Sequence, residues 1–188
     1  ARSVRMDSLF FNADGTIKKV IPTLRGAGVT DADKQIQMDR YSDKAPEGVA
    51  VDFIDTTNRF LGWKTIFTKE NTWIQYNSVD FSKKKFKTVN AKVISPAGGI
   101  LQLRLDNLGS PVIAEIKISA GNKWSNVKAT IPQVKPGVHH LFISSKDGKQ
   151  FFCYLYNLAQ KHLFPGNFFY QMQCFVHCFF LSKIGIIK

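Results

Sequence analysis

The chain has 188 residues and is 44% hydrophobic, so it can form one domain with a buried core plus short appendages. Its formal net charge of +12 could attract nucleic acid. The basic residues are scattered, however, and the dense run Lys83–Lys85 with Lys87 is typical of a solvated edge or turn. We therefore expect no nucleic-acid partner.

Residues 1–28 form a first segment that is too short to be a domain. Within it, the turn sequence Asn12–Gly15 lies between two apolar stretches and predicts a β-hairpin. Asp7 and Asp14 lie on this hairpin, and we interpret both as structural. We therefore interpret this segment as the end of a larger domain. The polar opening ARSVRMDS is not a signal peptide, which is uninformative if the chain begins inside a longer protein.

Residues 29–155 predict an all-β domain. Apolar and polar residues alternate along Leu101–Leu105, and in the run 112–118 every second residue is apolar while Glu115 and Lys117 fall between, a period typical of strands with one buried face. Turn sequences separate such runs at 96–99, 106–111, 120–122, 135–137 and 146–148. This spacing predicts a β-sandwich or jelly roll, in which two sheets pack face to face. His139 and His140 fall inside one strand pattern, and we interpret them as ordinary sheet residues.

The composition changes sharply near residue 151. No acidic residue and all three cysteines lie beyond that point. The C-x2-H-C spacing at 174–178 matches no closed four-ligand metal site. The apolar run from 168 onward is too short and too often interrupted by polar residues for a membrane span, so we expect no membrane partner. We interpret residues 156–188 as an atypical tail, of the kind that a shifted reading frame produces.

Two segments of the chain resemble known families. The first, with the run RSVRMDSLFFNADGTIKKVIPT, resembles the closing strands of family 43 glycoside hydrolases, whose catalytic domain is a five-bladed propeller. Residues 34–150 resemble a family 6 carbohydrate-binding module, a β-sandwich often fused directly after such a propeller. The matching motifs follow one another along the chain: KQIQMDRYS, FLGWKTI, NTWIQYNSVDFS, GGILQLRLDN, GNKWSNVKATI and PGVHHLFISSKDGKQF.

This resemblance implies a non-catalytic accessory module that binds xylan- or arabinoxylan-type plant polysaccharide. It also implies that the module was tethered to a hydrolase domain and acts outside the cell or in the periplasm. The two carboxylates that cleave a glycosidic bond would lie in propeller blades that precede residue 1. No catalytic residue is therefore expected in this chain.

The resemblance further implies where sugar binds. Sugars present faces of C–H bonds on which aromatic rings stack, and modules of this family commonly hold a sugar between two aromatic residues on loops. The matching positions are Trp63 and Trp124, each of which follows a turn-like segment. Trp73 lies inside a strand pattern, so we interpret it as packing. Phe152 stands where the family pattern places an asparagine, so the expected polar anchor is missing.

A structural calcium ion between the first and last strands is a second implication of the resemblance. Gln37 and Asp39 match, in chemistry, the pair of oxygen-bearing residues that family members use. Calcium takes about six to eight oxygen ligands. The last-strand aspartate, expected close to Tyr154, is absent from this chain. Calcium is therefore expected only if backbone carbonyl groups complete the shell.

Two other interpretations stay open at this point. A purely structural β-sandwich would brace the hydrolase without binding glycan, and the missing anchor at Phe152 favours that interpretation. A basic nucleic-acid-binding domain would bind DNA with a steep dependence on salt.

Overall fold

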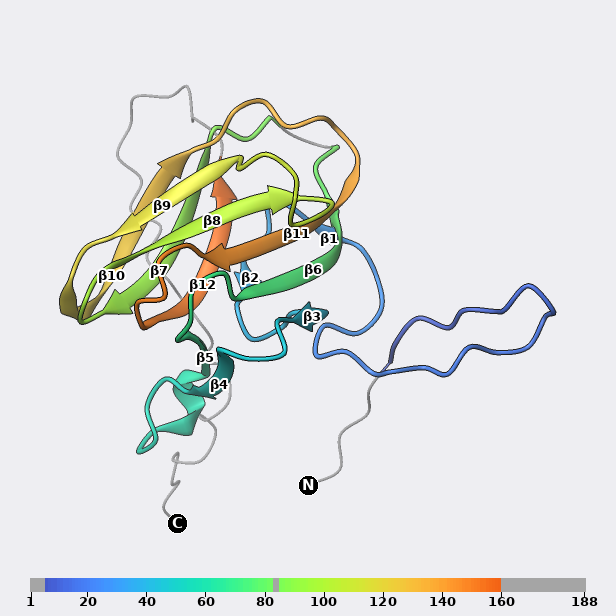
Figure 1. The fold of residues 1–188 in the computed structure, drawn as a ribbon, viewed down its shortest axis with the longest axis horizontal. Coiled ribbons are helices and arrows are strands. Elements are labelled where there is room, and N and C mark those ends of the chain that lie inside the picture. Colours follow the sequence, from blue (N-terminus) through green and yellow to red (C-terminus); the bar gives the residue numbers. More distant parts are fainter. Residues whose placement is uncertain (1–5, 83–84, 160–188) are drawn as a thin grey trace, which may run out of the picture.

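The computed structural model describes residues 6–82 and 85–159, and it contains two six-stranded sheets packed face to face (Figure 1). The first sheet has the order β1 (Thr30–Asp31), β6 (Trp73–Asp80), β11 (Val138–Ser145), β8 (Gly99–Leu105) and β9 (Ala114–Ile118), with β3 (Asp43–Lys44) paired to β6. The second has the order β10 (Gly121–Thr130), β7 (Thr88–Ser95), β12 (Phe151–Ala159), β5 (Trp63–Phe67) and β4 (Val49–Phe53), with β2 (Ile36–Gln37) paired to β12. Strand β1 pairs with β6 in parallel, whereas the other pairs are antiparallel. The predicted all-β sandwich is confirmed.

One core fills the space between the sheets. Every second residue is buried along β7 and β9, because successive side chains of a strand point to opposite faces. Tyr76 lies wholly inside this core, and its hydroxyl group donates to the Met38 carbonyl at 3.0 Å. The largest fully buried side chains come from both sheets: Phe67, Ile74, Tyr76, Leu101, Leu103, Ile116, Leu141, Ile143 and Phe151, with Met38 beside them.

Strand β12 lies in the interior of the second sheet, although it begins where the composition changes. It pairs with β7 on one side and with β5 and β2 on the other. Phe151 and Cys153 are both fully buried. Pairing continues as far as Ala159, so the strand runs four residues past the predicted end of the sandwich at 155. The first four residues of the predicted tail, 156–159, thus belong to the sandwich, and the rest of it, 160–188, lies outside the described residues.

Residues 6–28 form an arm that projects away from the sandwich (Figure 1). Its tip is the predicted turn, in which the Gly15 N–H donates to the Asn12 carbonyl at 3.0 Å and Phe11 bridges to Ile17. Apolar side chains along the arm are exposed, among them Phe10, Phe11, Ile17 and Ile21. At its base, the Asp7 carboxylate accepts hydrogen bonds from the Thr23 N–H and hydroxyl groups at 2.5 and 2.9 Å. The base of the arm is therefore ordered, whereas its apolar faces are uncovered.

Candidate carbohydrate-binding surfaces

Trp63 lies at the tip of the hairpin that joins β4 to β5. It is the first residue of β5 and follows the short helix η1 (Arg59–Leu61). Trp63, Thr65 and Phe67 share one face of the strand, but only the last two reach the core, so Trp63 stays 40% exposed. Its indole ring stacks on Phe53, directly opposite on β4, with ring centroids 4.0 Å apart and an angle of 27° between the planes. This contact holds the ring in place while part of it faces solvent.

The rest of the hairpin tip is also apolar. Phe60 is fully exposed and Leu61 nearly half exposed. The Arg59 guanidinium lies 5.0 Å from the centre of the Phe53 ring, on the same tip. The Asn58 side chain caps η1 by accepting from the Phe60 N–H at 3.2 Å, which fixes the turn that presents these residues. The tip is therefore an ordered aromatic surface.

Trp124 lies elsewhere on the same sheet. The predicted turn at 120–122 is shorter than expected, because β10 begins at Gly121 and Trp124 falls inside the strand. Its strand register against β7 shifts between Gly121 and Ser125, and the side chain is half-buried. Trp124 therefore occupies an irregular part of an edge strand rather than a loop.

The sheet order keeps the two tryptophans apart. Strands β12 and β7 lie between β5 and β10, so three inter-strand steps separate Trp63 from Trp124. At about 4.8 Å a step, their backbones are about 14 Å apart across the sheet. A single sugar ring held between two aromatic faces needs them about 7–8 Å apart, twice a van der Waals contact distance. The order of the strands therefore does not place Trp63 and Trp124 on opposite sides of a single sugar ring.

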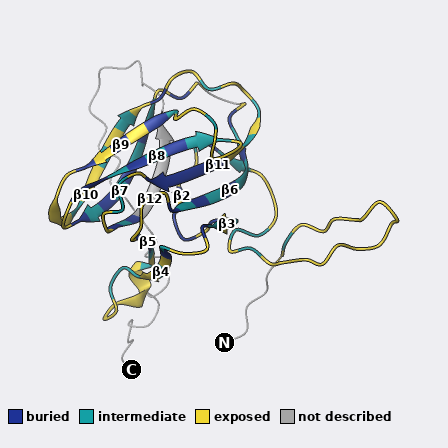
Figure 2. Ribbon diagram, viewed as in Figure 1, coloured by how far each residue is buried: buried dark blue, intermediate teal, exposed yellow. Residues whose placement is uncertain are grey.

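The sequence did not point to the outer face of the first sheet, whose strands β6, β8 and β9 carry buried and less buried residues along their length (Figure 2). Two rows of side chains lie directly opposite one another on this face. Their neighbours Ile74, Leu103 and Ile143 point into the core, so these rows face outward. One row crosses β3, β6, β11 and β8 and the next crosses β6, β11, β8 and β9: Asp43, Gln75, Phe142 and Arg104, then Trp73, Ser144, Gln102 and Glu115.

Aromatic and polar groups alternate on this face. Trp73 and Phe142 lie 5.8 Å apart with a tilt of 57°, and Trp73 also packs against the core. The Arg104 guanidinium donates to the Ser144 hydroxyl at 3.0 Å and to the Gln102 side-chain carbonyl at 2.7 Å. Phe142 and Ser144 are themselves buried, so sugar could reach only the partly exposed Trp73 and the amide and guanidinium groups beside it. This face is the second candidate surface for sugar hydroxyls and C–H faces.

A large pocket of about 700 Å³ opens between the edge strands β9 and β10. Val112, Glu115, Lys117 and Lys128 are among the residues that line it, and none of its lining residues is aromatic. Because sugar binding without reaction relies on aromatic stacking, this pocket is a weaker candidate than the hairpin tip or the sheet face.

Phe152, which replaces the expected polar anchor, lies on the outer face of β12. It is half-buried, opposite Ile66 of β5 and Ile94 of β7. The Lys64 ammonium group lies 5.4 Å from the centre of its ring. The position therefore offers an aromatic ring and a neighbouring cation, whereas the family pattern offers an amide.

Gln37 and Asp39 lie in or beside β2, next to the last strand, as the calcium expectation requires. The Asp39 carboxylate is nearly buried, and burial raises its pKa, although its own backbone N–H and Arg40 act in the opposite direction. Its charged neighbour is the Arg40 guanidinium, with Nε 3.5 Å from Oδ2. Across residues 6–82 and 85–159, no three His, Cys, Asp or Glu side chains gather as metal ligands. These side chains fit a calcium ion poorly, and calcium stays a prediction from the resemblance.

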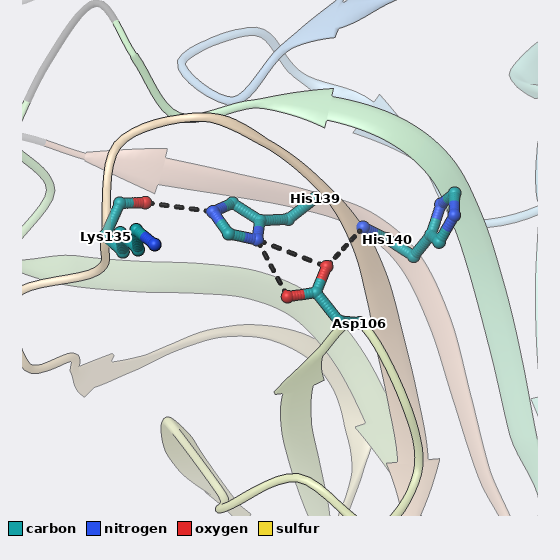
Figure 3. Close-up of polar contacts among 4 residues, drawn as sticks. All are labelled: Asp106, Lys135, His139 and His140. Atoms are coloured by element: carbon teal, nitrogen blue, oxygen red, sulfur yellow. Dashed lines mark hydrogen bonds and ion pairs between the residues drawn. The ribbon is translucent and has the colours of Figure 1, made fainter.

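His139 is held by contacts on both sides of its ring (Figure 3). Its Nδ1 atom lies 3.1 and 2.9 Å from the two Asp106 carboxylate oxygens, and Nε2 lies 3.0 Å from the Lys135 carbonyl oxygen. The carboxylate and the carbonyl only accept, so both contacts are hydrogen bonds when the ring is protonated. The ring thus links the segment before β11 to the turn after β8. This role is structural, because both ring nitrogens already have hydrogen-bond partners in the protein.

Asp106 is the acceptor at the centre of this arrangement. Partial burial works against its charge, but hydrogen bonds from the His139 ring and the His140 N–H, with the nearby histidine charges, hold its pKa below the usual value. Its backbone has a left-handed φ of 68°, which asparagine tolerates well. Asparagine at this position therefore removes the charge without straining the chain.

We expect Asp106→Asn to lower the free energy of unfolding by about 1 kcal/mol at pH 7, because the carboxylate is largely exposed. A lowered folded-state pKa gives stability that is present above about pH 4, the usual range for aspartate, and is lost as the pH falls through the folded value. The difference between variant and wild type should therefore shrink at pH 3. Urea denaturation at both pH values measures it, with Asp52→Asn, an exposed carboxylate on β4, as the control. An equal difference at pH 7 and pH 3 would contradict the charge assignment.

The chain is similar in sequence to known proteins. The sequence matches the family described as "Carbohydrate binding module (family 6)" over residues 45–163, more than half of the chain. A curated relative, an arabinoxylan arabinofuranohydrolase from Paenibacillus polymyxa, is 24% identical over 147 residues, which cover 76% of this chain and 23% of the relative. The chain thus spans about a quarter of that relative's length.

Solved structures show the same fold. A family 6 module from Clostridium stercorarium in complex with cellobiose has a TM-score of 0.63 at 16% identity, covering 71% of this chain and 98% of that one. A family 6 module from Clostridium cellulolyticum in complex with xylose has a TM-score of 0.61 at 20% identity, covering 70% and 100%. A family 43 arabinoxylan arabinofuranohydrolase from Bacillus subtilis in complex with cellotetraose has a TM-score of 0.63 at 17% identity, covering 82% and 33%.

The fold and the family match together define a carbohydrate-binding β-sandwich, a class of domain that binds glycan without catalysis. The chain belongs to family 6 of the carbohydrate-binding modules. In the described part of the chain, no helix is long and apolar enough to cross a membrane.

Proposed function

We propose that this module binds plant cell-wall polysaccharide of the xylan or arabinoxylan type, with a sugar ring stacked on Trp63. The observation that carries this proposal is the partly exposed indole, held in place by its stack on Phe53. A ring fixed in this way loses little conformational freedom when a sugar covers it. The fully exposed Phe60 and the Leu61 side chain extend the same surface.

Trp124 is the second proposed contact. Because three strand spacings separate it from Trp63, it would touch a different sugar unit of a bound chain. The glycan would then extend from the hairpin tip toward β10. Phe152 is not on this path, because it points to the outer face of the sheet, opposite to the face that carries Trp63, Thr65 and Phe67. This arrangement needs a polysaccharide rather than a single sugar for full affinity.

The choice of glycan rests on the relatives. The curated relative and one structural neighbour are named arabinoxylan arabinofuranohydrolases, and the Clostridium cellulolyticum module was solved with xylose. Other neighbours were solved with cellobiose and cellotriose, so β-glucans are the competing ligands. Arabinoxylan is accordingly the first ligand to test.

The arm supports a tether to a hydrolase domain. Isolated modules match almost their whole length to about 70% of this chain, whereas the hydrolase from Bacillus subtilis matches 82% of it. The uncovered apolar faces of residues 6–28 are what a strand pair taken from a larger domain would show. We propose that the arm closes a propeller-type hydrolase domain and that the protein acts outside the cell or in the periplasm, as is typical of such hydrolases.

Isothermal titration calorimetry with the whole chain tests the proposal. Arabinoxylan and xylo-oligosaccharides should bind, with affinity rising with oligosaccharide length and changing little between 50 and 500 mM NaCl, about a tenfold span chosen to expose any electrostatic binding. A DNA duplex serves as the comparison. Binding to DNA alone, falling steeply with salt, would replace this proposal with a nucleic-acid function.

A structural role without glycan binding is the second candidate. The phenylalanine at 152, in place of a polar anchor, is the observation that favours it. Strand β12 itself is formed and paired on both sides, so the sandwich is complete and could brace an enzyme. Failure of every tested glycan to bind a folded chain would select this role.

A further inference from the structure

A pocket of about 320 Å³ lies where the base of the arm meets β1 and β2, and it is lined in part by Gln37, one of the two residues expected to hold calcium. The side chains around it carry hydrogen-bond donors: two guanidinium groups, two amides and a hydroxyl group. Its lining residues are Arg25, Thr30, Gln35, Ile36, Gln37 and Arg40. No carboxylate is among these residues.

Arg25 is the more confined of the two arginines. It is half-buried, and its Nη2 donates to the Thr30 hydroxyl at 2.8 Å and to the Ser78 carbonyl at 3.1 Å. A guanidinium has five N–H donors, so three more are left over. Among the residues whose side chains the structure describes, none supplies a carboxylate to Arg25. Burial lowers its pKa, with Tyr76 acting against that effect, as expected for a cation withdrawn from water without a counter-ion.

Arg40 brings a second positive charge to the same pocket. Its Nε lies 3.5 Å from the Asp39 Oδ2 atom, longer than a charge-assisted hydrogen bond, and its side chain is 59% exposed. The Arg40 guanidinium is thus only loosely paired with Asp39 and lines the pocket with donors to spare. The Thr30 hydroxyl accepts from Arg25, so its own proton can be donated into the pocket.

The hydrogen-bond donors around the pocket are unsuited to a cation. Calcium requires a shell of oxygen acceptors, whereas the pocket presents N–H donors under two positive charges. Guanidinium groups bind carboxylate, sulfate and phosphate through paired N–H donors, and they do so best where water is partly excluded. We propose that this pocket binds a small oxyanion, the carboxylate or sulfate group of an acidic glycan substituent or the free anion, in the place where the family resemblance implies calcium.

Thermal unfolding of the whole chain tests whether the pocket binds an oxyanion or calcium. At constant ionic strength, replacing chloride by 10 mM sulfate should raise the Tm by roughly 3 °C if sulfate binds with a Kd of about 1 mM. Calcium chloride and a chelator should each leave the Tm unchanged. Arg40→Gln should reduce the sulfate response at least tenfold in apparent affinity, because it removes an exposed donor that has no core contact. Lys128→Gln, on β10, is the control with the same change in charge.

The source of the anion is found by competition. Glucuronate-bearing xylo-oligosaccharide is titrated against sulfate, beside the same oligosaccharide with its carboxyl groups reduced. If only the acidic oligosaccharide competes with sulfate, the ligand is the acidic substituent of a glycan. If sulfate binds but neither oligosaccharide competes, the ligand is the free anion. Both results support an oxyanion site. A Tm that responds equally to sulfate and chloride, or one raised by calcium and lowered by the chelator, overturns the proposal, even if neutral glycan binds normally.

Discussion

Phe151→Ala should lower the free energy of unfolding by about 3–5 kcal/mol, a large part of the stability of a domain of this size. The Phe151 side chain is fully buried and stacks on Phe67 of β5 at 5.0 Å between ring centroids. On its other side it packs against Gly99 of β8, close enough that a Cβ there would lie 3.1 Å from the ring. The ring therefore joins the two sheets, and alanine would leave a cavity that neither sheet can close.

Phe152→Ala provides the matched control, since it removes the same side chain one residue later. Phe152 points to the outer face, where it is half-buried and contacts Lys64. Its loss should cost about 1 kcal/mol or less. Chemical denaturation followed by tryptophan fluorescence measures both variants. Equal losses at 151 and 152 would show that β12 is not seated in the sheet with Phe151 inward.

The two sheets could be predicted because their strands carry a strong local pattern. Leu101, Leu103, Ile116 and Ile118 alternate with polar residues in the sequence, and all four are buried in the structure. Alternation alone determines which side of a strand faces the core. It did not predict that β12 runs to Ala159, because the strand is rich in aromatic and apolar residues on both faces and the composition suggested a break.

The candidate site was harder to predict, because it depends on which strands are neighbours. Trp63 and Trp124 each follow a turn-like segment, and nothing local indicates that β12 and β7 lie between them. The two rows of side chains on the outer face of the first sheet could not be predicted for the same reason. Gln75, Phe142 and Arg104 come from distant segments and become neighbours only through the register of β6, β11 and β8. Long-range pairing of this kind has no signature in a single sequence.

Trp63→Ala should weaken binding of xylo-oligosaccharide by about tenfold to a hundredfold, the equivalent of about 1.4–2.8 kcal/mol. The indole is the proposed platform, and its removal deletes the apolar face on which the sugar lies. Trp63→Tyr should restore most of the affinity, because a smaller aromatic face remains at the same position. Trp124→Ala should weaken binding less, and only for ligands long enough to reach β10.

Trp73→Ala tests whether sugar binds at the hairpin tip or on the outer face of the first sheet. Trp73 packs on Phe142 and on the core, so its loss should lower stability but leave glycan affinity unchanged if the tip is the site. Calorimetric titration of the three tryptophan variants, each first shown to be folded by its thermal transition, gives the comparison. Unchanged affinity in Trp63→Ala together with lost affinity in Trp73→Ala would move the site to the outer face of β6 and β11. In that case the sugar would lie against the partly exposed Trp73, bordered by the half-buried Gln75 and Arg104 side chains.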